Sequence, residues 1–164
     1  MKFNYLKTGV LLQLQSSGAT IRILPDICIL ISHNLSRLIK LGFLEGFEIV
    51  IPDFVEYTVD VLCDGRLKAG FYSELDELRE LEKERMISLL YCDYEKPLPK
   101  YKQDLIRLED EFILEIAVAT NSILFTSDKE LKDEATSIKQ PVIYIPPMFH
   151  KEIKDLASQL ERYG

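Results

Sequence analysis

The sequence predicts a single α/β domain, a three-layer α/β/α sandwich with a mainly parallel central sheet. Short apolar runs of strand type alternate with segments of helical spacing, which is the order of β-α-β units. The run from Phe47 to Ile51 is apolar enough to be buried on both faces, as in a parallel sheet. Right-handed crossovers then put helices on both faces. The length of 164 residues suits one domain with a well-buried core.

The composition excludes several classes of protein. Twenty Lys and Arg against 27 Asp and Glu give a net charge of −7, which argues against loose coating of nucleic acid. Cys28, Cys63 and Cys92 are far apart and form no CxxC pair, so we expect reduced thiols in a cytoplasmic protein and no zinc site. Gln13 and Gln15 interrupt the first apolar run before it reaches the length of a signal peptide, and no stretch is expected to span a membrane.

Apolar spacing and breaker residues define the elements expected in the first half of the chain. They are a strand or hairpin over 8–15 and 19–25, a helix over 29–41, a strand over 47–51, a helix from Pro52, a loop over 63–72 and a helix from Ser73 to about Leu90. Ser73 with Asp76 forms a capping-box pattern for this last helix. Gly65 and Gly70 have the spacing of a phosphate-binding loop, but Phe71 follows them instead of Lys and Ser or Thr, so that motif is excluded.

The second half centres on a helix that leads into a strand. Its expected elements are a helix over 103–121, a strand over 123–125, a short helix from Lys129, a strand over 142–145 and a final helix after Pro146 and Pro147. From Asp110 the helix descends roughly 18 Å and the strand climbs back roughly 16 Å. Asp110 and Asp128 therefore reach the same edge of the sheet.

Three acidic residues lie at the edge where an open parallel sheet binds its ligands. Asp26 follows one strand, Asp110 lies high on a helix, and Asp128 follows the next strand. Each alone is an ordinary turn, cap or first-turn acid, and only their joint order and spacing point to a site. Carboxylates that converge raise one another's pKa and need a cation, and hard oxygen ligands suit Mg²⁺ or Mn²⁺.

The acidic segments also resemble those of a known family. Asp110-x-x-Ile113-x-x-x-Ala117 and Thr126-x-Asp128 resemble the third and fourth acidic segments of PIN domains, the fold of VapC-type toxin ribonucleases and related nucleases. Asp26 to Leu30 resembles the first segment, with Ile27 and Cys28 where small polar residues are usual. Ile51 to Val59 resembles the second segment, with Thr58 where the family has its second acidic residue. The resemblance covers about 21–145 of a single domain over 1–164, and leaves unexplained a helical insertion at about 73–102 and a C-terminal helix at about 148–162.

The resemblance implies a metal-dependent endoribonuclease acting on single-stranded RNA, as the toxin of a toxin–antitoxin pair. Asp26, Asp110 and Asp128 would hold Mg²⁺ or Mn²⁺, and Thr126 or Ser127 would orient the site. Glu56 and Thr58 are additional candidates, although Glu56 lies on the other side of its helix from Thr58. The implied partners are single-stranded RNA, an antitoxin protein and a second copy of the chain.

Two other interpretations stay open at this point. Thr58 favours a PIN-like binding or regulatory module that has lost catalysis. A phosphoaspartyl receiver is disfavoured because no acidic pair precedes its acceptor strand. His33 and His150 lack a partner at metal spacing and are expected at the surface or at helix caps. The stretch from Tyr91 to Lys102, which mixes tyrosines with lysines, is interpreted as a solvated loop rather than a grip on a single strand.

Overall fold

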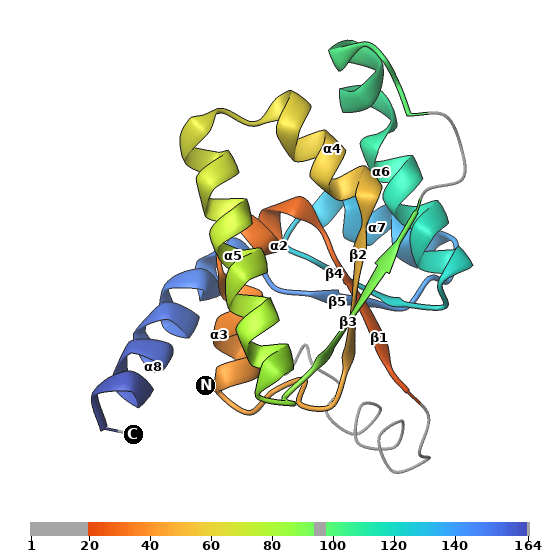
Figure 1. Cartoon of the computed structure of the whole chain (residues 1–164). Coiled ribbons are helices and arrows are strands. Elements are labelled where there is room, and N and C mark those ends of the chain that lie inside the picture. The colour runs from red at the N-terminus through yellow and green to blue at the C-terminus, as the bar shows by residue number, and fades with distance from the viewer. Residues whose placement is uncertain (1–19, 94–97, 164) are drawn as a thin grey trace.

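The computed structural model describes residues 20–93 and 98–163, and these form a five-stranded, all-parallel sheet (Figure 1). The strand order is β3-β2-β1-β4-β5. The strands are β1 (Arg22–Pro25), β2 (Glu48–Pro52), β3 (Ser88–Cys92), β4 (Ile123–Thr126) and β5 (Val142–Tyr144). The predicted three-layer sandwich with a parallel sheet is confirmed. The strand expected over 8–15 lies outside the described residues.

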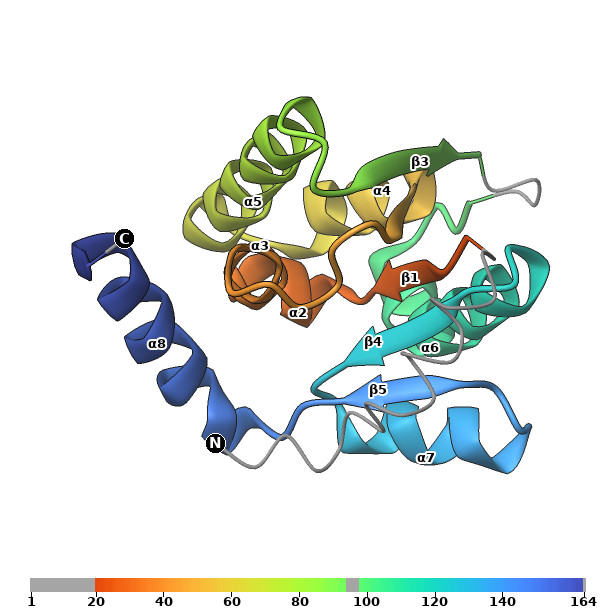
Figure 2. The ribbon, with the colours of Figure 1, turned by 90° about the horizontal axis from the view of Figure 1, so that it is seen from below.

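Helices cover both faces of this sheet. They are α2 (Ile27–Ile31), α3 (Asn34–Lys40), α4 (Asp53–Leu62), α5 (Gly65–Lys83), α6 (Lys102–Ala119), α7 (Lys129–Ser137), the 3₁₀ turn η1 (Pro147–Phe149) and α8 (His150–Tyr163). Helices α2, α3 and α5 pack together on one face, with α8 against α3, while α6 and α7 cover the other (Figure 2). Helix α4 packs on α6, where the rings of Phe54 and Phe112 meet edge to face with centroids 5.3 Å apart.

The central strands are buried because both of their faces carry apolar side chains. Ile23, Leu24, Ile49 and Val50 have no exposed surface, and Phe125 on β4 has none either. A strand covered on both sides needs such a continuous apolar run rather than an alternating one. One hydrophobic core therefore joins the two helical layers through the sheet. Among the described helices, none combines the length and the apolar character needed to cross a membrane.

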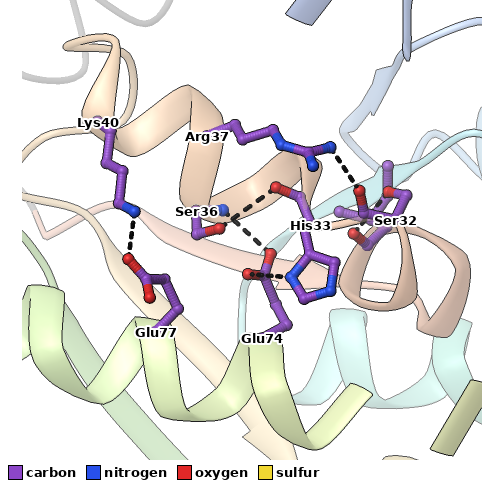
Figure 3. A network of polar contacts seen from close by, with 8 residues as sticks. Ser32, His33, Ser36, Arg37, Lys40, Glu74 and Glu77 are labelled. Atoms are coloured by element: carbon purple, nitrogen blue, oxygen red, sulfur yellow. Dashed lines mark hydrogen bonds and ion pairs between the residues drawn. The ribbon is translucent and has the colours of Figure 1, made fainter. Parts of the chain in front are cut away.

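The helix expected over 29–41 is broken in two. His33 adopts a left-handed backbone with φ 60°, so α2 ends and α3 starts in a new direction. Glu74 of α5 stabilises the break: its fully buried carboxylate accepts the Ser36 backbone N–H at 3.1 Å and lies 3.3 Å from His33 Nδ1 (Figure 3). Because the start of α3 has no cap from its own side chain, an acid from another helix satisfies one of its free N–H groups.

The segment after α4 also departs from the sequence prediction. The expected loop over 63–72 is helical, because Asp64 caps α5 by accepting the Leu67 N–H at 3.2 Å. The helix expected to reach Leu90 ends at Lys83. Just after it, Arg85 takes a left-handed conformation with φ 61°, and the Met86 N–H donates back to the carbonyl of Leu81, which closes the helix. The residues that follow form β3, which among the described strands pairs only with β2.

Candidate functional site

Asp26 stands at the junction of β1 and α2. It is the N-cap of α2, and its Oδ1 accepts the Ile29 backbone N–H at 2.9 Å. Its Oδ2 accepts a hydrogen bond from the Thr126 hydroxyl of β4. The carboxyl group is only 5% exposed. Asp26 therefore fixes the start of a helix and joins two neighbouring strands at their carboxyl ends.

Asp128 occupies the equivalent junction after the neighbouring strand. It is the N-cap of α7 and its Oδ1 accepts the N–H groups of Glu130 at 2.8 Å and Leu131 at 3.3 Å. Its own N–H donates to Thr126 Oγ1 at 2.9 Å. Since β1 and β4 are parallel, with Pro25 opposite Phe125, Asp26 and Asp128 reach the same edge. Thr126, which is completely buried, connects them.

Asp110 brings a third carboxylate from α6. Burial raises its pKa, and the negative charges of Asp128, Glu134 and Glu130 raise it further. The pKa of Asp26 rises from 3.8 to about 6, mainly through burial. The hydrogen bonds from Thr126 and Ile29 oppose that rise, and the charges of Asp128 and Asp110 add to it. The structure thus brings Asp26, Asp110 and Asp128 within electrostatic reach of one another.

Glu109 is a fourth acid that the sequence prediction missed. Its pKa rises from 4.5 to about 7, and burial is the largest cause. The negative charges of Asp110, Asp26 and Asp128, in decreasing order, also raise it. Asp26, Glu109, Asp110 and Asp128 are called the acid cluster below. The only pointer in the sequence is the acidic run from Glu109 to Glu111, and helical spacing alone does not say which of its members turns inward.

The two candidates on α4 make other contacts. Thr58 is 1% exposed, and its hydroxyl donates within its own helix to the carbonyl of Phe54 at 2.8 Å. The charge of Glu56 acts on Tyr72 of α5. The pKa of Tyr72 rises to about 12, and burial is the largest cause. The hydrogen bond to Asp60 and the charge of Asp60 contribute less, and the charge of Glu56 contributes least. Glu56 is not among the charges that raise the pKa of Asp26, Glu109 or Asp110.

Ser127 connects the site to the last helix. Its buried hydroxyl lies 2.8 Å from Nε2 of His150, the first residue of α8. Burial lowers the pKa of His150, so the imidazole is neutral at pH 7. This pair anchors the start of α8 beside the residue that precedes Asp128. Both histidines take cap positions, as expected: His33 is the N-cap of α3 and His150 the C-cap of η1.

The acid cluster matches a hard divalent cation in chemistry. Its members are all oxygen donors. The charges that raise the pKa of Asp26, Glu109 and Asp110 are all carboxylates, so a bound cation would relieve their repulsion. As their side chains stand, however, no three His, Cys, Asp or Glu residues within 20–93 and 98–163 are arranged to hold one metal ion.

Fold and site together define a parallel α/β/α sandwich with buried acids at the carboxyl edge of its central strands. No family model matches the chain, and no curated protein matches it. Among solved structures it is similar to a domain of a functionally unknown protein from Methanocaldococcus jannaschii, with TM-score 0.65 and 26% identity over 77% of this chain and 91% of that one. It is also matched to a PilT N-terminus domain protein from Sulfolobus solfataricus, with TM-score 0.45 and 16% identity over 84% and 93% of the two chains.

Proposed function

We propose that this chain is a PIN-like, metal-dependent endoribonuclease that acts on single-stranded RNA. The observation that carries the proposal is the acid cluster, in which carboxylates from two strand ends and one helix share an edge of the sheet. Crowding buried carboxylates costs stability, and such clusters are characteristic of functional sites. The choice of RNA follows from the resemblance of the four acidic segments to those of PIN-domain ribonucleases.

In this proposal Asp26, Asp110 and Asp128 hold Mg²⁺ or Mn²⁺, and Glu109 supplies the charge that Thr58 does not. The bound metal would polarise a phosphoryl oxygen and lower the pKa of the attacking water. Thr126 keeps Asp26 and Asp128 at a fixed separation through its two hydrogen bonds. Ser127, held by His150, limits movement of the segment that carries Asp128. An antitoxin, a homodimer and a cytoplasmic location belong to the same proposal.

A PIN-like binding or regulatory module is the second candidate function. Two observations favour it: Thr58 is packed in the core as a neutral, satisfied side chain, and the acids of the cluster do not converge as ligands. Such a module would keep the fold and the cluster but would not cleave RNA.

Mn²⁺ binding and RNA cleavage, measured on the same preparations, test the two candidates. We expect calorimetric Mn²⁺ binding and slow, EDTA-sensitive cleavage of a labelled single-stranded RNA, both reduced in Asp110→Asn. Asp133→Asn, on the exposed side of α7, is the matched control and should behave as wild type. Metal binding without cleavage would favour the binding module. Absence of both would overturn the metal site.

A further inference from the structure

The start of α6 presents an exposed tyrosine between two lysines. Tyr101 is 71% exposed, and Lys100 and Lys102 on either side of it are exposed as well. Within 20–93 and 98–163, neither lysine forms an ion pair, and the Tyr101 side chain has no hydrogen bond or ring contact. The aromatic ring and both positive charges are therefore open to a ligand.

The backbone that carries these side chains is held in place. The Tyr57 hydroxyl of α4 donates to the carbonyl of Pro99 at 2.7 Å, and the Leu105 N–H donates to the carbonyl of Tyr101 at 3.0 Å. Leu98 packs against the hydrophobic core, and the ring of Pro99 fixes its own φ. A backbone fixed on both sides of Tyr101 lowers the entropy that a ligand must overcome on binding.

This stretch is positively charged on an acidic protein. Residues 98–103 contain Lys100 and Lys102 and no Asp or Glu, although the whole chain carries a net charge of −7. The next acid along the chain, Asp104, pairs with Arg107 at 3.5 Å. Positive charge attracts phosphates, and every nucleobase has an aromatic face that can stack on a tyrosine ring. Cations beside an exposed aromatic ring are the combination by which proteins bind a single strand without reading its sequence.

Helix α6 connects this group to the acid cluster. It begins at Lys102 and carries Glu109 and Asp110 about two turns later. At 1.5 Å per residue, Asp110 lies about 12 Å from Lys102 along the helix. The start of α6 lies beyond the carboxyl ends of β2 and β3, at the top of Figure 1. At 3.4 Å per nucleotide in a stacked strand, this separation corresponds to about four nucleotides.

From these observations we infer that Lys100, Tyr101 and Lys102 form a binding subsite for single-stranded RNA, called the Tyr101 subsite below. Tyr101 stacks on a base about four nucleotides from the phosphate at the acid cluster, and the lysines bind the phosphates on either side of that base. The inference rests on the proposed function for its choice of RNA, and it goes further by placing the strand along α6. Because a tyrosine ring accepts any base, the subsite supplies affinity and position rather than sequence preference.

RNA binding without cleavage tests the Tyr101 subsite. The full-length protein in EDTA is titrated into a fluorescein-labelled single-stranded RNA of about twelve nucleotides, and fluorescence anisotropy gives the Kd. Tyr101→Ala should weaken binding about tenfold, whereas Tyr101→Phe, which keeps the ring, should stay within about twofold of wild type. The matched control is Tyr91→Ala, since Tyr91 is 52% exposed and its hydroxyl accepts a hydrogen bond from Arg79 of α5 at 3.3 Å. This control should leave the Kd unchanged, and circular dichroism verifies that each variant is folded.

The salt dependence of binding tests the two lysines. Lys100→Gln and Lys102→Gln should each reduce the slope of log Kd against log salt concentration by about 0.7, the value for one phosphate contact on a single strand. Tyr101→Ala should weaken binding without changing this slope, because stacking releases no counterions. An unchanged slope in both lysine variants would contradict the phosphate contacts.

The Tyr101 subsite would be overturned by equal Kd values for Tyr101→Ala and wild type, or by equal losses in Tyr101→Ala and Tyr91→Ala. Displacement of the RNA by oligoglutamate as readily as by unlabelled RNA would also overturn it, since that would indicate a site for acidic peptides. Failure of the proposed nuclease gives a different result. Binding that depends on Tyr101 in EDTA, without cleavage in Mn²⁺, supports the subsite and contradicts the nuclease. Cleavage in Mn²⁺ with no effect of Tyr101→Ala on the Kd contradicts the subsite alone.

Discussion

The Thr126 hydroxyl donates to the buried carboxylate of Asp26 and accepts the backbone N–H of Asp128, so one side chain connects two acids that are far apart in sequence. The bond to Asp26 is buried and the bond from Asp128 is partly buried, and Thr126 itself has no exposed surface. A polar group in such a place has no water to replace a lost partner. The three residues therefore behave as one structural unit.

Thr126→Val should destabilise the protein by about 1–3 kcal/mol, because it keeps the shape but removes both hydrogen bonds. It should also raise the pKa of Asp26 further, since the bond from Thr126 is one of the interactions that lower it. Urea unfolding at pH 7 measures the first effect. The control is Thr136→Val on the exposed side of α7, where we expect a change within about 0.5 kcal/mol. Equal effects at both positions would contradict the structural role of Thr126.

The raised pKa of Asp26 predicts how stability depends on pH in metal-free buffer. Its folded pKa of about 6 exceeds the ordinary value of 3.8, so the folded state binds this proton more tightly. The resulting stabilisation is fully present below about pH 4 and is lost as the pH rises through 6. A difference of 2.2 pKa units corresponds to about 3 kcal/mol at most.

Asp26→Asn isolates this contribution. Other carboxylates also titrate, so the quantity to follow is the unfolding free energy of Asp26→Asn minus that of the wild type, in EDTA from pH 4 to pH 7. We expect the difference to increase with pH. Asp133→Asn, which replaces an exposed acid, should show a flat difference. A flat difference for Asp26→Asn as well would mean that the carboxyl group titrates normally.

Glu109→Gln and Glu56→Gln should separate the two candidates for the second acid of the site. On the proposed function, Glu109→Gln should weaken Mn²⁺ binding about tenfold or more, because Glu109 acts electrostatically on Asp110 and Asp26. Glu56→Gln should leave the affinity unchanged, since Glu56 is not among the charges that raise the pKa of Asp26, Glu109 or Asp110. Isothermal titration calorimetry measures both. A larger loss at Glu56 would show that α4 turns toward the cluster when metal binds.

Glu74→Ala should destabilise the fold by about 1–3 kcal/mol, because it leaves the buried N–H of Ser36 without an acceptor. Glu74→Gln keeps a carbonyl oxygen at this position and should cost less. Thermal unfolding of the two variants ranks them. If both lose the same stability, the negative charge of Glu74, rather than its acceptor, holds the break between α2 and α3.

The central strands and the helices that follow them could be predicted because the local propensity of their residues and the burial that the fold requires agree. The strand before Asp26 and the strand before Asp128 are apolar runs that are buried on both faces, and the acids that follow them cap helices as expected. The start of α6 was also correct to within one residue. The grouping of Asp26 and Asp128 at one edge then follows from the parallel pairing of β1 with β4.

The remaining errors have identifiable physical causes. The end of α5 was missed because Arg85, not glycine, adopts the left-handed conformation there, and Met86 and Leu89 continue a helical spacing into β3. The break at His33 was missed because its stabilising partner, Glu74, is distant in sequence. Glu109 was missed because burial decides which acid of a run turns inward, and burial is a property of the tertiary structure.

The capping roles of Asp26 and Asp128 have an evolutionary consequence. Both residues begin a helix through a side-chain oxygen, and asparagine caps helices about as well as aspartate. A descendant of this chain could therefore exchange both acids for asparagine, lose two negative charges at this edge of the sheet and still inherit the architecture. If related chains keep aspartate at both positions, helix capping alone does not account for it.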